Sequence, residues 1–179
     1  VTREASALIS TYQSISSFPE PDRQDLQKML LDLARFEVED EWPMLQEGQV
    51  ISGGRVKTAA IESRIMAFVP ETKALEHVHE RAIDSFNTFI EQRRLRLYSA
   101  VSGIPPILWY VVIVGALINM VLIWLLDSRL IAQLVLGGLL AFFLGSMILL
   151  IAVMAKPFQT RAGVSSGALV AAYQFMTKE

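Results

Sequence analysis

Two uncharged apolar runs, residues 104–126 and 130–155, constrain this chain more than any other feature of its sequence. Each run exceeds the roughly 20 residues that a helix needs to cross about 30 Å of hydrocarbon. They are separated only by Asp127, Ser128 and Arg129, which leaves room for a tight reversal. Because backbone amides in lipid must be satisfied within their own segment, an open sheet is excluded. The runs therefore predict a transmembrane helical hairpin with antiparallel neighbours.

Basic residues flank the outer ends of this hairpin. Arg93, Arg94 and Arg96 precede the first run and Lys156 follows the second. Positive charge is retained on the cytoplasmic side of a membrane. We therefore expect a multi-pass protein of the cell (inner) membrane, with its soluble domain and both chain ends in the cytoplasm. These four residues would mark the cytoplasmic boundary, with binding of an anion or lipid headgroup as the alternative role.

The charge of the chain is divided between two unlike halves. Residues 1–91 hold 9 Lys and Arg against 16 Asp and Glu, whereas residues 92–179 hold 7 against 2. An acidic half followed by a membrane half with basic flanks offers no basic face to nucleic acid, so nucleic-acid binding is excluded. Membrane lipids are the expected partners. The chain contains no cysteine, which excludes disulfides, thiolate metal sites and cysteine nucleophiles.

Apolar residues outside the spans recur at helical spacing, and no convincing stretch has the period of a strand. The expected fold class is all-α, a cytoplasmic helical bundle with long helices plus the two-helix hairpin. The expected parts are a cytoplasmic helical domain over 1–103, the hairpin over 104–155 and a cytoplasmic C-terminal segment over 156–179. A rod-like helix beginning after Thr72 should continue to about Ser102, and a short amphipathic or interfacial helix is expected over 163–176.

Two further features of the soluble part have specific interpretations. The acidic run from Glu37 to Glu41 lacks the glycine and ligand spacing of a calcium loop, so we interpret it as a solvated acidic face. The helix expected over 55–69 has candidate inward-facing positions. They are Val56, Ala59, Ala60, Met66 and Val69.

Polar and small residues within the spans are candidates for contacts between helices. Asn119 and Gln133 are expected to lie close enough to face each other, which favours an interhelical hydrogen bond over an ion pathway. Gly137, Ala141 and Gly145 form a row of small residues on the second span that permits close approach of a neighbouring helix.

Nothing in the sequence favours catalysis or a bound cofactor. Residues are not grouped as a nucleophilic triad, a paired-carboxylate site or a zinc signature, so the interpretation is a non-enzyme with no cofactor and no metal. His77 and His79 are two residues apart and would point to different faces of a helix, which prevents them from chelating one ion together.

Four stretches in this order resemble the bestrophin-like family of membrane proteins, which are distantly similar to the bestrophin anion channels. They are E-A-x-x-L (Glu4, Ala5, Leu8), D-E-W-P (Asp40–Pro43), R-x-x-R-L with I-P-x-x-L-W (Arg93, Arg96, Leu97, Ile104, Pro105, Leu108, Trp109) and P-F (Pro157, Phe158). The resemblance covers nearly the whole chain. It implies a homo-oligomeric ion channel subunit with an anion as the candidate permeant species; the alternative is a non-conducting scaffold or accessory subunit that recruits cytoplasmic partners.

The resemblance has two limits. In both families a further pair of transmembrane helices precedes the E-A-x-x-L helix, so the pore neck is expected upstream of Val1 and its residues are unknown. The acidic run that follows the last span in animal bestrophins has no counterpart after Lys156-Pro157-Phe158-Gln159, so the resemblance does not imply gating by calcium.

Overall fold

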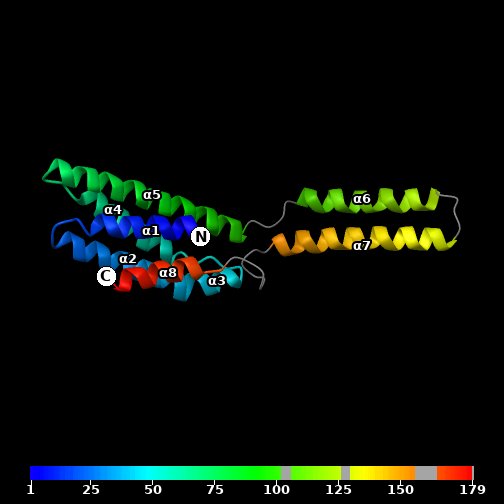
Figure 1. Ribbon diagram of the computed structural model, residues 1–179, viewed down its shortest axis with the longest axis horizontal. Coiled ribbons are helices and arrows are strands. Elements are labelled where there is room, and N and C mark those ends of the chain that lie inside the picture. The colour runs from blue at the N-terminus through cyan, green and yellow to red at the C-terminus, as the bar shows by residue number, and fades with distance from the viewer. Residues whose placement is uncertain (102–105, 126–129, 156–164, 179) are drawn as a thin grey trace.

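A computed structural model describes residues 1–101, 106–125, 130–155 and 165–178, and every regular element in these ranges is helical (Figure 1). The all-α prediction is therefore confirmed. In chain order the elements are α1 (Thr2–Ile15), α2 (Asp22–Phe36), the π-helical turn η1 (Glu37–Glu41), α3 (Trp42–Gln46), α4 (Gly53–Ala67), α5 (Lys73–Val101), α6 (Pro106–Leu125), α7 (Leu130–Ala155) and α8 (Gly167–Lys178).

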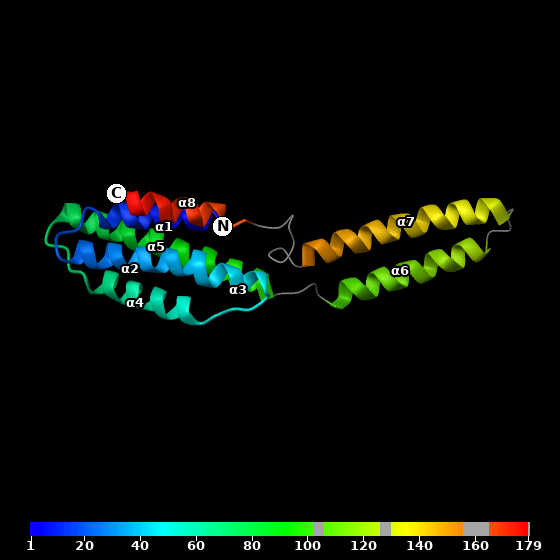
Figure 2. The same cartoon turned by 90° about the horizontal axis from the view of Figure 1, so that it is seen from below.

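Helix α1 is central to the bundle, where it contacts α2, α5 and α8, while α4 packs on α2 and α5 (Figure 2). The apolar stripes of these helices meet in one core, in which residues such as Leu8, Leu30 and Phe86 are almost fully buried. Burying a side chain of this size contributes roughly 1.5–3 kcal/mol relative to leaving it in water. Chain segments distant in sequence, α1 and α8 included, are held together by this core.

An aromatic group closes the end of the bundle away from α6 and α7. The rings of Phe18 and Phe68 are stacked with centroids 4.3 Å apart, and His79 lies edge-on to both. Nε2 of His79 lies 2.8 Å from the carbonyl oxygen of Ile65. His77 is exposed instead and its Nδ1 lies 3.6 Å from Glu80. The two histidines thus have separate partners.

The bounds of the helices agree well with the sequence patterns, but the buried face of α4 differs from the predicted one. Helix α5 begins after Thr72, whose Oγ1 accepts a hydrogen bond from the backbone N–H of Leu75 at 3.3 Å. The predicted inner positions are wrong, because Val56 and Met66 of α4 are 68% and 54% exposed and Val69, after its end, is 79% exposed. Ala59 and Ala60 of α4 are exposed too. The buried positions of α4 are Gly54, Thr58, Ile61 and Ile65.

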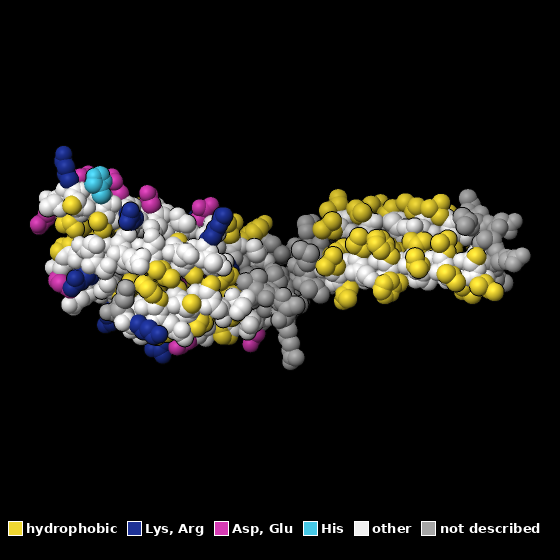
Figure 3. All heavy atoms as spheres, in the orientation of Figure 1, with side chains coloured by type: hydrophobic (Ala, Val, Ile, Leu, Met, Phe, Trp, Pro, Cys, Tyr) yellow, Lys and Arg dark blue, Asp and Glu magenta, His cyan; other side chains and the backbone are white. Residues whose placement is uncertain are grey.

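Helices α6 and α7 lie side by side and extend from one end of the bundle (Figure 1). Each contains a window long and apolar enough to cross a membrane, Ile107–Trp124 and Ile131–Ile151. Their apolar side chains cover the outside of the pair (Figure 3), as expected for surfaces that face lipid. Helix α8 differs from an interfacial helix, because Leu169, Ala172 and Met176 are buried in the bundle.

Candidate functional site

Five charged side chains from three parts of the chain meet inside the bundle, at the end next to α6 and α7. They are Glu4 of α1, Glu37 and Glu41 of η1, and Arg93 and Arg96 of α5. All five are at least 95% buried. We call them the buried ion cluster. Charged side chains are rarely buried so deeply in a protein unless they are paired, as these five are.

Two guanidinium groups bridge the three carboxylates. Arg96 donates to both oxygens of Glu4 at 2.9–3.1 Å and to Glu41 at 3.1 Å. Arg93 donates from Nε to Glu37 at 2.8 Å and from Nη2 to Glu41. Arginine suits this role because its planar fork matches carboxylate geometry and keeps its charge when buried.

Local helix geometry brings these groups together. The π-helical turn between α2 and α3 places Glu37 and Glu41 on one side of the chain, and Arg93 and Arg96, three residues apart on α5, share a face opposite them. Trp42, directly after the turn, lies beneath the Arg96 guanidinium, 5.7 Å from its ring centroid. Such cation–π contact further holds the guanidinium in place.

Gly54 is required by the close approach of α4 to the cluster. A Cβ atom at this position would lie 1.9 Å from Nη2 of Arg93 and 2.8 Å from a carboxylate oxygen of Glu41. Any side chain would therefore displace the ion pair. The inner face of α4 is formed by small residues here because larger ones would not fit.

The cluster has three carboxylates for two guanidinium groups, and one proton would balance the charge. Burial raises the pKa of the Glu37 carboxyl to about 8, and the neighbouring Glu4 and Glu41 charges add to this effect, although Arg96 and Arg93 oppose it. Burial also raises the pKa of Glu4, against the lowering effect of Arg96. Glu37 is therefore the group expected to hold the proton near neutral pH.

Two polar atoms of the buried ion cluster remain without a hydrogen-bond partner within the described residues. They are Oε2 of Glu37 and Nη1 of Arg96. Leaving such atoms unpaired costs free energy, so the cluster is not optimised for stability alone.

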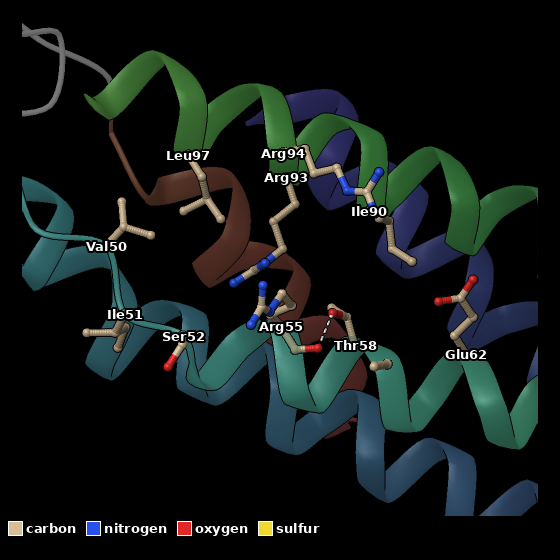
Figure 4. A pocket seen from close by; sticks show the side chains of 11 residues that line it. Val50, Ile51, Ser52, Arg55, Thr58, Glu62, Ile90, Arg93, Arg94 and Leu97 are labelled. Atoms are coloured by element: carbon tan, nitrogen blue, oxygen red, sulfur yellow. Dashed lines mark hydrogen bonds between the residues drawn. The ribbon is translucent and has the colours of Figure 1, made fainter. Parts of the chain in front are cut away.

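A cavity of about 380 Å³ borders the cluster on the side of α4 (Figure 4). Arg93 belongs to both, because it pairs with Glu37 and Glu41 and also lines the cavity. The other lining residues come from α4, α5 and the loop before α4. They are Val50, Ile51, Ser52, Arg55, Thr58, Ala59, Glu62, Ile90, Arg94 and Leu97.

The structure separates the basic residues that the sequence grouped at the membrane boundary. Arg93 and Arg96 are buried among carboxylates, whereas Arg94 is exposed at the cavity. For Arg93 and Arg96 this position differs from contact with headgroups, because their charges are already engaged by Glu4, Glu37 and Glu41. Lys156 lies outside the described residues, so its boundary role stays a prediction.

The acidic run is likewise divided. The interpretation of Glu37–Glu41 as a solvated face is wrong for Glu37 and Glu41, which are fully buried, while Glu39 and Asp40 are exposed. The sequence did contain a signal for this arrangement. Two glutamates four apart and two arginines three apart each lie on one helical face, which is the spacing expected of two facing charged patches.

The polar and small residues of the spans have varied surroundings. Asn119 donates to the carbonyl oxygen of Gly115 in its own helix at 2.8 Å. Gln133 is half-buried and has an interaction of its own. On α7 a Cβ at Gly137 would lie 4.0 Å from Ile123 of α6, whereas one at Gly145 would meet nothing within 4 Å, and Ala141 is exposed. Gly137 therefore faces α6, and Gly145 and Ala141 face outward.

Comparison with known proteins gives one result. The family model for the Bestrophin-like domain matches residues 1–169. The chain belongs to the Bestrophin-like family. No curated protein and no solved structure matches it.

The motifs that resemble this family converge on the buried ion cluster. E-A-x-x-L contributes Glu4, D-E-W-P contributes Glu41 and Trp42, and R-x-x-R-L contributes Arg93 and Arg96. Of I-P-x-x-L-W, Leu108 and Trp109 lie on α6 and take no part in the cluster, and the P-F motif lies outside the described residues. Together with the two apolar helices, the family match makes this a membrane-associated Bestrophin-like protein.

Proposed function

We propose that this Bestrophin-like protein is a subunit of a homo-oligomeric ion channel that conducts anions. In this proposal α6 and α7 cross the cell membrane and the helical bundle lies in the cytoplasm. The family match over residues 1–169 is the observation that carries the proposal. The two apolar helices and their apolar outer surface support it.

The arrangement of the bundle fits a subunit that responds to its surroundings. Helix α5 leads from the core toward α6, and the buried ion cluster joins its last turns to α1 and η1. A displacement of α5 along its axis would break several charge-assisted hydrogen bonds at once. The cluster would therefore favour discrete positions of α5 over a continuous range.

Reconstitution into planar bilayers tests the channel proposal. We expect current above that of protein-free bilayers, with a reversal potential under a potassium chloride gradient that follows the chloride equilibrium potential. A reversal potential that follows potassium would contradict anion selectivity. Absence of current at every voltage and salt tested, from protein shown to be folded and inserted, would contradict conduction.

A second candidate function is a non-conducting membrane scaffold that recruits a cytoplasmic partner. The observation that favours it is the exposed apolar side of α4 with Val56 and Met66, because such residues outside a core often mark a protein interface. Under this alternative, bilayers carry no current and affinity capture from native membranes retrieves another protein in fixed stoichiometry. Recovery of the chain bound only to itself would contradict the scaffold.

A further inference from the structure

The cavity between α4 and α5 is lined by more basic than acidic side chains. Arg55 and Arg94 line it with one carboxylate, that of Glu62, and Arg93 lines it too but is paired with Glu37 and Glu41. Arg55 and Arg94 are exposed and, across the described ranges, form no ion pair within 4 Å. Like charges repel one another less when an anion lies between them, so Arg55 and Arg94 favour an anion at this cavity.

The directions of the side chains support this interpretation. The guanidinium groups of Arg93 and Arg55 point toward one another from opposite walls of the cavity, and Arg94 extends along α5 on the side of Ile90 (Figure 4). Arg93 is about 95% buried, and Nε and Nη2 are engaged by Glu37 and Glu41.

The start of α4 adds to the positive potential. The N-cap residue Ser52 lines the cavity, and its side chain forms no capping hydrogen bond. Backbone N–H groups at an uncapped helix N-terminus attract anions through hydrogen bonding and the helix dipole. Because Arg55 and Arg94 supply the main argument, this helix end is only an additional contribution.

Size and lining limit the class of ligand. A volume of about 380 Å³ is at the small end of the range for ligand pockets. Besides the charged groups, the walls are apolar, with Ile51, Ile90 and Leu97 among them. Guanidinium forks bind phosphate through paired hydrogen bonds, and apolar walls suit a hydrocarbon portion attached to it.

We propose that this cavity is a cytoplasmic binding site for a phosphate group that carries a short apolar extension. Arg55 and Arg94 bind the phosphate, and the apolar wall contacts the extension. Two sources share this chemistry: a soluble phosphate monoester and the headgroup of an anionic phospholipid. Its cytoplasmic position rests on the proposed function, whereas phosphate binding can be measured whether or not the protein conducts.

The test uses the whole protein in detergent, titrated with inorganic phosphate and with butyl phosphate by calorimetry. The double variant Arg55→Gln and Arg94→Gln should weaken binding at least tenfold, because it removes two guanidinium groups that donate charge-assisted hydrogen bonds. The control pair Lys28→Gln and Arg81→Gln removes two exposed cations outside the cavity and should leave affinity unchanged. Ala59→Trp, which fills the cavity without altering charge, should also abolish binding.

A second arm separates the two sources. The protein is placed in nanodiscs of phosphatidylcholine alone or mixed with phosphatidic acid, and its thermal unfolding is followed. Binding of the soluble phosphates identifies a monoester; stabilisation by phosphatidic acid alone, lost in the Arg55→Gln and Arg94→Gln variant, identifies a headgroup. The proposal is overturned if neither probe binds, or if the control pair weakens binding as much as the cavity variants do.

Discussion

Arg96, near the end of α5, donates three hydrogen bonds of 2.9–3.1 Å to the two oxygens of Glu4, which lies 92 positions earlier in the first turn of α1. This bidentate contact ties the beginning of the chain to the helix that leads toward the first span. Because both side chains are buried, the loss of one partner leaves an uncompensated charge inside the bundle.

Replacement of Arg96 by Leu should therefore destabilise the bundle strongly. We expect a loss of about 3–5 kcal/mol, the cost typical of breaking a buried pair by removing one partner. Thermal or denaturant unfolding of the protein in detergent measures it. Arg64→Gln is the matched control, since Arg64 pairs with Asp22 at the surface and should cost no more than about 1 kcal/mol. Equal losses for the two variants would contradict the prediction.

The pH dependence of stability should reveal the proton on Glu37. Its pKa is about 8 in the folded protein against an ordinary value of 4.5, so the folded state keeps a proton that the unfolded state loses between these values. The free energy of unfolding should accordingly fall as pH rises from about 4.5 to about 8. Below this pH window the contribution of the Glu37 proton to the free energy of unfolding is fully present.

Glu37→Gln tests this directly, because the amide resembles the protonated acid in shape and charge. We expect a flatter pH profile and a higher melting temperature than wild type above pH 8. Glu39→Gln, two residues away and exposed, should retain the wild-type profile. A Glu37→Gln protein with the wild-type slope would show that Glu37 stays ionised throughout.

Gly54→Ala should disturb the cluster through sterics alone. The added methyl group would overlap Nη2 of Arg93, and overpacking of this kind costs about 1–3 kcal/mol. Unfolding measurements should show the loss, whereas Gly138→Ala, where a Cβ meets nothing within 4 Å, should be nearly neutral. A neutral Gly54→Ala would mean that α4 shifts away from α5 at little cost.

The exposed apolar side of α4 should take part in self-association if the protein is a homo-oligomer. Val56→Glu together with Met66→Glu places charge on residues that are 68% and 54% exposed, so folding of the single chain should be unaffected. Light scattering of the detergent-solubilised protein should show a smaller assembly. Asn87→Glu, exposed on α5, serves as the control. An assembly of unchanged size would show that this side of α4 does not mediate self-association.

Membrane topology can be tested by labelling single introduced cysteines, because this chain contains no cysteine of its own that would react. Ser128→Cys lies between the two spans in the sequence and Lys28→Cys lies on the exposed side of α2. An impermeant thiol reagent applied to intact cells should label the first and spare the second. The reverse pattern would place the bundle outside the cell.

The sequence predicted those elements whose signal is local. The second span was predicted with the bounds of α7, because a long uncharged run has one solution in lipid, and α5 was predicted from its apolar period and the Thr72 cap. The inner face of α4 was not predicted correctly, because Gly54 and Thr58 stand in place of large apolar residues where the helix approaches Arg93. Burial of Glu37 and Glu41 depends on partners 52–56 residues away. The spacing of the charges indicates a shared helical face, but it does not identify the element that covers that face.

Helices α5 and α8, which precede and follow the hairpin in the chain, both pack against α1. The pair α6 and α7 is thus connected to the same helix, α1, through the two separate helices α5 and α8. If α5 moves along its axis while α8 stays in place, the two contacts would exert unequal forces on α1 and rotate it. A sliding motion between α6 and α7 would therefore reach the bundle as rotation of its innermost helix.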